Sequence, residues 1–350
     1  MSWLDPSLAA EGARIMTICN ACRYCEGYCA VFPAMEKRME FGPSDLGYLA
    51  NLCHNCGACL PACQYAPPHE FGVNVPQTLT KIRLQTYQLP ATRSTALAIV
   101  ALVVMFFSIV LVTVSPGVVF ARHDGGKFFD VFPHNVMVLT FLAVAAYAFM
   151  RLWISLSRYR REMQDPPLTY KSVQRALRDA FSLVNLGGGG EGCIDENERP
   201  SQVRRIYHHF AFYGFLSCFA ATVVAAFYDN ALGRHAPYSI FSVPVVLGTL
   251  GGISLLIGST GLLMLSRKRD AALTDPRQGP MDVVFIVMLL LTASTGLLLL
   301  VFRGTAAMGT LLALHLAIVF GLIFSMPFGK FVHGFYRLAA LIRFATEEGD

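Results

Sequence analysis

Two short cysteine-rich stretches dominate the first part of the sequence, CNACRYCEGYC at residues 19–29 and CHNCGACLPAC at residues 53–63. Each stretch follows the pattern C-x2-C-x2-C-x3-C, and the second repeats the first at an offset of 34 residues. Together they hold eight of the ten cysteines of the chain. We therefore interpret this region as an internal duplication of one cysteine-based unit.

The spacing within each run is the one that holds a [4Fe–4S] cluster in bacterial ferredoxins, where the fourth cysteine of a run ligates the other cluster. We therefore expect two clusters. Their ligand sets are Cys19, Cys22, Cys25 and Cys63 for the first cluster, and Cys53, Cys56, Cys59 and Cys29 for the second. Zinc is the alternative, but zinc sites usually show separated cysteine pairs rather than runs of four. Cys193 and Cys218 lie outside the runs, and we predict that both are ordinary packing residues.

The rest of the chain is strongly apolar. Hydrophobic residues make up 54% of the 350 residues and charged residues 15%, whereas an ordinary soluble protein carries about 25% charged residues. Stretches of roughly 20 apolar residues, long enough to cross a bilayer, lie at about 94–114, 135–155, 209–228, 240–265, 282–302 and 308–326. The sequence thus predicts a mainly α-helical protein, with a small ferredoxin-type head over residues 1–93 and a six-helix transmembrane bundle within residues 94–350.

The distribution of lysine and arginine predicts the orientation, because cytoplasmic loops carry an excess of both. With the N-terminus inside, the inner segments hold 24 of these residues and the outer segments hold 4. The first 20 residues also lack the basic and apolar regions of a secretory signal peptide. We expect a multi-pass protein of the inner (cytoplasmic) membrane with both termini in the cytoplasm. The lipid bilayer, and not nucleic acid, then accounts for the net charge of +5.

One inner loop, TYKSVQRALRDAFSLV at residues 169–184, has the pattern of an amphipathic helix. Apolar residues such as Leu177 and Phe181 share one face, and basic residues such as Arg175 and Arg178 lie towards the other. This pattern favours a helix that lies in the interface of the inner leaflet. The alternative is a helix that packs on the head or on a partner protein.

Histidines at the inner ends of the predicted spans are candidate ligands, since ionisable residues in a membrane are usually functional. His208 and His209 open the third span, and His333 follows the sixth span at the same face. Two imidazoles on facing helices can be the axial ligands of a b-type haem. We predict His209 and His333 as ligands of an inner haem, with His208 as the alternative to His209. The other interpretation is that these histidines contact lipid headgroups or backbone carbonyls.

Two further histidines lie towards the outer face. His315 sits in the sixth span, about 10 Å below that face at 1.5 Å per helical residue, and His134 opens the second span. They could ligate a second haem or line a quinone pocket. They could also be hydrogen-bonded by neighbouring helices, and the sequence leaves the three interpretations open.

The last four spans resemble the haem-b membrane subunit of respiratory nitrate reductase and its relatives in heterodisulfide-reductase-type complexes. The stretches RRIYHHFAFYGF at 204–215 and HLAIVFGLIFSMPFGKFVH at 315–333 carry this resemblance. In that family one helix carries two haem histidines ten residues apart, and a later helix carries two that are eighteen apart. His315 and His333 show the second spacing.

The first spacing of that family is absent. Cys218 and Phe219 stand ten residues after His208 and His209. The resemblance therefore implies an inner haem with both ligands, and an outer haem only if His134 substitutes for the missing ligand.

The whole chain is similar to the tricarballylate/citrate utilisation protein B family, through both cysteine runs and both histidine-containing stretches. That family joins a duplicated [4Fe–4S] head to a membrane haem domain. The resemblance implies a protein that reoxidises the reduced flavin of a cytoplasmic FAD-dependent dehydrogenase, which converts tricarballylate to cis-aconitate. It also implies that the electrons pass through two [4Fe–4S] clusters and haem b to membrane quinone.

The residues themselves indicate electron transfer. We find no P-loop, no nucleophile–base pair and no dinucleotide motif after a strand. Flavin and substrate chemistry must then belong to a partner, and this chain is the electron-transfer component of a flavoprotein:quinone oxidoreductase system. A second hypothesis reverses the flow, so that the chain oxidises quinol and feeds a cytoplasmic reductase. A third is a membrane iron–sulfur redox sensor, which predicts no turnover with quinone.

Overall fold

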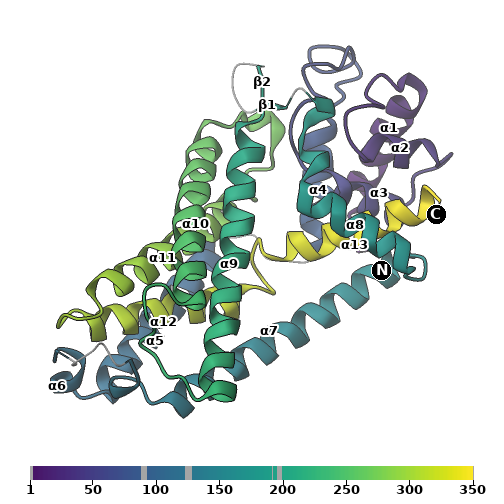
Figure 1. Cartoon of the computed structure of the whole chain (residues 1–350). Coiled ribbons are helices and arrows are strands. Elements are labelled where there is room, and N and C mark those ends of the chain that lie inside the picture. The colour runs from purple at the N-terminus through teal and green to yellow at the C-terminus, as the bar shows by residue number, and fades with distance from the viewer. Residues whose placement is uncertain (1–2, 88–92, 123–127, 191, 195–198, 350) are drawn as a thin grey trace.

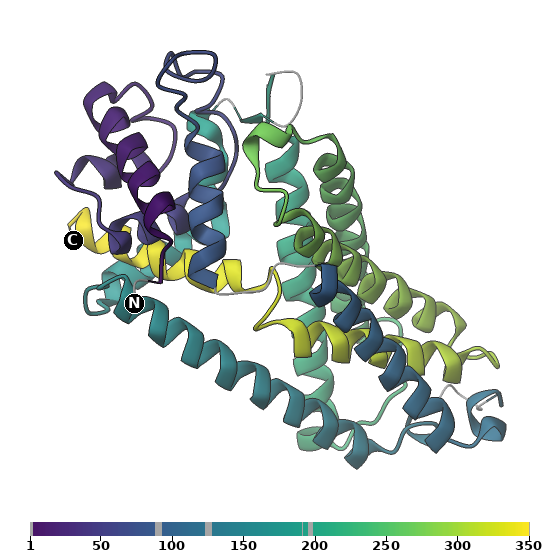
Figure 2. The ribbon, with the colours of Figure 1, turned by 180° about the vertical axis from the view of Figure 1, so that it is seen from behind.

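The computed structural model of the chain describes residues 3–87, 93–122, 128–190, 192–194 and 199–349, and these are mainly helical. Within them, one antiparallel pair of short strands, β1 (Cys193–Ile194) and β2 (Pro200–Ser201), places Cys193 opposite Ser201. Figures 1 and 2 show a cluster of short helices at one end and a group of long helices that extends away from it. Residues 88–92, at the end of the predicted head, lie outside the described residues.

The head, which we define as residues 3–87, contains the helices α1 (Pro6–Cys22), α2 (Val31–Glu36), α3 (Pro43–Leu52) and α4 (Val75–Tyr87). The carboxylate of Asp5 accepts hydrogen bonds from the first turn of α1, as N-cap residues do. This helix ends where Arg23 adopts a left-handed φ of 55°. Each cysteine run starts at the end of a helix, because α1 ends at Cys22 and α3 ends just before Cys53.

Two helices from distant parts of the chain complete the head. α8 (Tyr170–Ser182) and α13 (Val332–Glu347) pack against each other, and α13 also packs on α3. Ala176 of α8 and Ala340 and Leu341 of α13 are buried in the same core as Leu46 and Leu49 of α3. The core of the head therefore depends on the C-terminal helix as well as on the N-terminal residues.

Largely buried ion pairs fasten α13 to the head. Arg38 holds Glu347 at 2.6 Å and Asp45 at 2.7 Å. The guanidinium group of Arg343 lies 4.2 Å from the centre of the Tyr48 ring. Because a buried charge that loses its partner is costly, these contacts keep the last helix in a defined place.

The structure also shows how the predicted amphipathic helix is used. Ser172 and Ala176 of α8 are buried against the head and α13, as the packing alternative requires. Leu177 and Phe181 remain 38% and 41% exposed. The helix therefore packs on the head through one face and presents apolar side chains on another. Contact of these side chains with the inner leaflet stays a prediction.

Among the residues that the structure describes, five helices are long and apolar enough to cross a membrane. They are α7 (His134–Glu162), α9 (Val203–Leu232), α10 (Val243–Lys268), α11 (Gly279–Phe302) and α12 (Met308–Ser325), and they coincide with the second to sixth predicted spans. The first predicted span corresponds to α5 (Arg93–Thr113), in which the shorter segment Leu97–Thr113 is the apolar helix. The remaining helical elements are α6 (Pro116–Val119) and short 3-10 turns at Phe128–Asp130, Val184–Leu186, Gly188–Gly190 and Ala271–Leu273.

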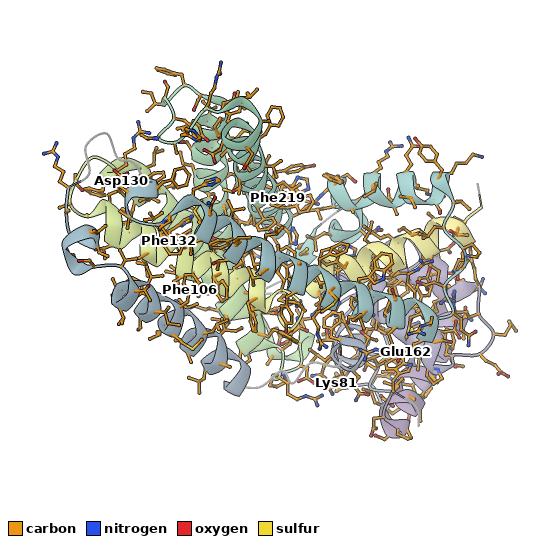
Figure 3. All side chains as sticks on the ribbon, turned by 90° about the horizontal axis from the view of Figure 1, so that it is seen from below. Lys81, Phe106, Asp130, Phe132, Glu162 and Phe219 are labelled. Carbon is orange, nitrogen blue, oxygen red and sulfur yellow. The ribbon has the colours of Figure 1, made fainter. Side chains whose placement is uncertain are left out.

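The long helices form a bundle around α12, which packs on α5, α7 and α11, while α9, α10 and α11 form an adjacent row. α7 runs diagonally from the far end of the bundle to the head (Figures 1 and 2). Leu139 and Phe149 on α7 are 65% and 69% exposed, which suits a lipid environment. Figure 3 shows Phe106 among the long helices and Lys81 and Glu162 at the head end.

The structure differs from the resemblance at the end of the sixth span. α12 ends at Ser325, and residues 326–331 form turns before α13 begins. Pro327 lies in this stretch and has no backbone N–H with which to continue the helix. His315 and His333 therefore stand on two different helices, whereas the resemblance places both on one.

α9 and α10 approach each other so closely that at several positions only glycine, which has a hydrogen in place of a Cβ atom, fits between the two backbones. A Cβ atom built on Gly258 would lie 2.3 Å from the backbone nitrogen of Ala211, and one on Gly214 would lie 2.5 Å from that of Leu255. Small residues permit this approach in membrane helices. The contact fixes the first turns of α9, where His208 is located.

We expect Gly258→Ala to destabilise the protein by about 1–3 kcal/mol, because the added methyl group meets backbone that cannot move aside. Gly248→Ala is the matched control, since its Cβ would lie 3.7 Å from that of Ala221, an ordinary contact. Both substitutions gain about 1 kcal/mol of helix propensity, so the control should be neutral or stabilising. Thermal unfolding of the two variants in detergent checks this, and equal melting temperatures would contradict the close packing.

Candidate metal centres

The first set of cysteines draws on both runs. Burial, followed by the neighbouring thiols of Cys63, Cys25 and Cys22, raises the pKa of the Cys19 thiol to about 12. Burial likewise raises the pKa of the Cys25 thiol to about 11, again with contributions from Cys63 and Cys22. Cys63 therefore lies with the first run and not with its own.

The second set consists of the other four cysteines of the two runs, Cys29, Cys53, Cys56 and Cys59. Burial raises the pKa of the Cys29 thiol well above its ordinary value, and Cys56 and Cys53 raise it further. The Cys59 thiol shows the same shift from burial, followed by Cys56, Cys53 and Cys29. These four cysteines line a cavity with about 370 Å³ of space free of atoms, part of it open to solvent. The structure thus brings together the two sets expected for crossed ligation, and the ligation itself stays a prediction.

Groups of four buried thiols suit a metal cluster. A cysteine binds metal as the thiolate, and thiolates crowded away from water repel one another unless a metal supplies positive charge. In the part of the chain that the structure describes, no three His, Cys, Asp or Glu side chains converge closely enough to hold one metal ion. A cubane binds each thiolate through a different iron, so two sets of four cysteines from runs of this spacing suit [4Fe–4S] clusters, whereas zinc sites usually use separated pairs.

Arginines from four separate segments frame the second set at the junction between the head and the long helices. They are Arg83 of α4, Arg204 of α9, Arg269 just after α10 and Arg337 of α13. Arg337 donates to the carbonyl of Cys53 at 2.7 Å, and Arg204 donates to the carbonyl of Asn55 at 3.2 Å. The other two arginines bind the same two carbonyl oxygens. Their positive charge favours thiolates and a negatively charged cluster.

His208 and His333 face each other at the inner end of the long helices. Their ring centres are 6.4 Å apart and their ring planes meet at 77°. Imidazoles that bind one iron from opposite sides have ring centres about 6 Å apart, because each metal–nitrogen bond is about 2.0 Å. In the described structure, Nδ1 of His208 is buried without a hydrogen-bond partner. Nδ1 of His333 lies 2.5 Å from the carbonyl of Lys330, which leaves Nε2 for a metal. The two imidazoles would therefore suit as the ligands of one b-type haem iron, and haem binding itself stays a prediction.

His209 points in another direction. Its Nε2 lies 3.2 Å from the carbonyl oxygen of Ser182, at the end of α8. Because an α-helix has 3.6 residues per turn, adjacent side chains point about 100° apart, so only one of two neighbouring histidines can face His333. The geometry thus favours His208, the alternative in our sequence-based prediction, over His209.

The two outer histidines have separate partners. Nδ1 of His315 lies 2.9 Å from the hydroxyl of Thr295 on α11. His134 contacts the carboxylate of Asp229, whose other oxygen lies 2.5 Å from Nδ1 of His235. Among the described residues the rings of His134 and His315 do not contact each other. This arrangement agrees with hydrogen bonding by neighbouring helices, and a second haem or a quinone pocket stays a prediction.

His54 connects the second cysteine set to the paired histidines. It follows Cys53 in the chain and is buried. Burial lowers the pKa of His54 well below its ordinary value, and the nearby Arg337 and His208 lower it further. Arg337 also lies near His333, whose pKa it lowers in addition to the larger effect of burial. The loop of the second set and the histidine pair are therefore contiguous.

These features define a class of protein: a mainly helical, multi-span chain with an N-terminal ferredoxin-like head that carries two sets of iron–sulfur ligand candidates. Comparisons with known proteins then identify the family. The family model described as Citrate utilization protein B matches residues 88–350, and the one described as Citrate utilization protein B Fer4-like domain matches residues 12–89. The chain belongs to the citrate utilization protein B family.

A curated relative supports this assignment. The Citrate utilization protein B of Escherichia coli is 48% identical to this chain over 350 residues, which covers 97% of this chain and 92% of the relative. No solved structure matches the chain.

Proposed function

We propose that the chain is the membrane electron-transfer partner of a cytoplasmic FAD-dependent dehydrogenase. It takes electrons from the reduced flavin of that enzyme and delivers them to membrane quinone. Two [4Fe–4S] clusters and one b-type haem, when bound, supply carriers that each take one electron at a time. The family supports a role in citrate or tricarballylate utilisation. The resemblance described above makes tricarballylate dehydrogenase the expected partner.

The observation that carries this proposal is that one arginine connects the second cysteine set to the paired histidines. Arg337 donates to the carbonyl of Cys53 and is near enough to His54 and His333 to lower the pKa of both. His54 in turn lies beside His208. A head that served only as a membrane anchor or a sensor would need no such contact with the inner ends of the membrane helices.

The solvent exposure of the two cysteine sets indicates which of them a soluble flavoprotein can approach. Cys53 and Cys56 of the second set are 7% and 8% exposed. All four cysteines of the first set are partly exposed, whereas in the second set only Cys29 and Cys59 are; the Cys22 thiol lies 3.8 Å from the exposed amide of Gln64. The first set is therefore the one that a soluble flavoprotein can approach, and the second lies on the way to the membrane helices.

The proposed topology is that of an inner-membrane protein with both termini in the cytoplasm. Its support is the excess of lysine and arginine in the inner segments. Both termini also belong to the head, beside α8 and α13 (Figure 1). All cytoplasmic parts of the chain would then lie at one end of the helices.

The first test is the composition and spectrum of the full chain purified in detergent. We expect about one haem and about eight non-haem irons per chain, as two [4Fe–4S] clusters require, and a b-type absorption band on reduction with dithionite. In membrane vesicles, the reduced dehydrogenase should reduce a quinone only when this chain is present. Zinc in place of iron, iron without haem, or no quinone reduction would each contradict the proposal.

A further inference from the structure

Asn55 lies between Cys53 and Cys56, and it lines the cavity of the second cysteine set. The residue is only 4% exposed. Within the residues that the structure describes, both Nδ2 and Oδ1 of its side-chain amide are buried without a hydrogen-bond partner. A buried amide that lacks a partner is costly, and the rare cases in proteins call for an explanation such as a water, an ion or another bound group. The amide of Asn55 therefore indicates a further group in this cavity.

The backbone of Asn55 is held on both sides. Its carbonyl oxygen accepts hydrogen bonds from Arg204 at 3.2 Å and from Arg269. Its N–H donates to the Sγ of Cys53 at 3.4 Å. The φ angle is 53°, in the left-handed region that asparagine adopts more readily than most residues. Glycine adopts this conformation just as readily, so the backbone conformation does not by itself explain why an amide side chain is buried here.

Two other polar side chains line the cavity and have partners of their own. Nδ1 of His54 lies 2.9 Å from the carbonyl oxygen of Leu52. Oδ1 of Asn185 accepts a hydrogen bond from the backbone N–H of Ala30 at 3.2 Å. The acceptors that a bound [4Fe–4S] cluster would bring to the cavity are sulfur atoms, and the NH2 group of an asparagine offers two donors. Nδ2 of Asn55 therefore suits the sulfurs of such a cluster.

We propose that the side-chain amide of Asn55 donates hydrogen bonds to sulfur atoms of the second cluster and so raises its reduction potential. This inference rests on the proposed function, because it requires a cluster on Cys53 and Cys56. Reduction adds one electron and makes the sulfur atoms more negative, so a donated hydrogen bond stabilises the reduced form more than the oxidised form. Hydrogen bonds to the sulfurs are among the features that set cluster potentials.

The duplicated cysteine runs differ at this position. At the offset of 34 residues, Asn55 of the second run corresponds to Ala21 of the first run. Alanine has no side-chain donor, so this position should make the second cluster easier to reduce than the first. That order favours electron flow from the more exposed first set to the second set, which lies towards the paired histidines.

The test compares Asn55→Gly and Asn55→Ser with the wild type in the full chain. Glycine keeps the left-handed backbone and removes the amide, whereas serine keeps a shorter donor. The readouts are iron content and the midpoint potential of each cluster, from a redox titration followed by electron paramagnetic resonance. We expect Asn55→Gly to lower one midpoint by up to about 59 mV, a tenfold change for one electron, and to leave the other unchanged. Asn55→Ser should stay nearer the wild type.

Asn20→Ala is the matched control. Asn20 is the asparagine of the first run, and its Nδ2 already donates to the carbonyl of Arg38 at 2.9 Å. The midpoint that falls in Asn55→Gly should keep its wild-type value in Asn20→Ala. An equal fall of that midpoint in the control would show a general effect of amide removal on the head and would overturn the role of Asn55.

The outcomes separate the two proposals. A wild-type protein without iron–sulfur clusters overturns the proposed function itself. Two clusters with unchanged midpoints in Asn55→Gly, or with both midpoints shifted equally, overturn the role of Asn55 alone, and a water molecule would then satisfy the amide. If Asn55→Gly does not retain the second cluster, Asn55→Ser decides. Serine adopts the left-handed backbone less readily than glycine, so retention of the cluster in Asn55→Ser supports the hydrogen bond and its loss there contradicts it.

Discussion

Replacement of His208 by alanine is expected to remove the b-type haem from the purified protein. Its ring centre lies 6.4 Å from that of His333, so under the proposed function the substitution would delete one of the two haem ligands. Loss of a residue that merely supports a metal ligand costs about 10–100-fold in metal affinity, and loss of the ligand itself should cost at least as much. Haem per chain should fall by more than about tenfold, and quinone reduction should fall with it.

His209→Ala provides the matched control. The substitution removes an imidazole from the next position of the same helix, with its contact to the Ser182 carbonyl and its ring contact with Tyr213. Haem content should stay near the wild-type value. The absorption band of the reduced haem measures both variants, and retained iron in both shows that the head is folded. Haem lost from His209→Ala and kept in His208→Ala would restore the sequence-based choice of His209.

The sequence could not decide between these two histidines for a geometrical reason. Both follow the same short polar stretch and precede the same apolar run, so depth in the membrane hardly distinguishes them. What separates them is rotation about the axis of α9. That rotation is fixed by the close contact of Gly258 with Ala211 and by α8, which offers a carbonyl to His209.

The end of the sixth span at Ser325 lies within one residue of the end predicted from the sequence, where Pro327 follows the apolar run and cannot continue the helix. The resemblance, in which two histidines eighteen residues apart share one helix, did not include this break. Packing of α13 on the head shows why the chain turns here. Ala340 and Leu341 of that helix are buried in the head core.

The cysteine runs were more informative, because their spacing is local and the chemistry of iron restricts it. The grouping of Cys63 with the first run and of Cys29 with the second follows from a pattern read within 45 residues of sequence. The contact of Cys193 with Cys56 could not be read in this way. The two residues lie far apart in the sequence, and no motif or periodic pattern marks Cys193.

The same holds for the arginines that frame the second set. Arg83, Arg204 and Arg337 come from three different helices, and each resembles an ordinary residue at the inner end of a membrane segment. The count of lysine and arginine used them only to orient the spans. Their carbonyl contacts with Cys53 and Asn55 show a second use, which is to hold the cluster loop against the membrane helices.

Crossed ligation predicts that Cys63→Ala and Cys19→Ala damage the same cluster, although these residues belong to different runs. Burial and the Cys63 thiol together raise the pKa of Cys19, which places both thiols in one set. Each variant should lose about four of the eight irons, or convert one cluster to a form with fewer irons. The second cluster should keep its resonance signal and its midpoint potential.

Cys29→Ala and Cys53→Ala should show the reverse pattern, because both residues line the cavity of the second set. Electron paramagnetic resonance of the four dithionite-reduced variants makes the comparison. Cys19 and Cys63 should share one missing or altered signal, and Cys29 and Cys53 should share the other. If Cys29→Ala instead removed the same signal as Cys19→Ala, each run would bind its own cluster. The cavity that the structure forms from both runs would then not be the cluster site.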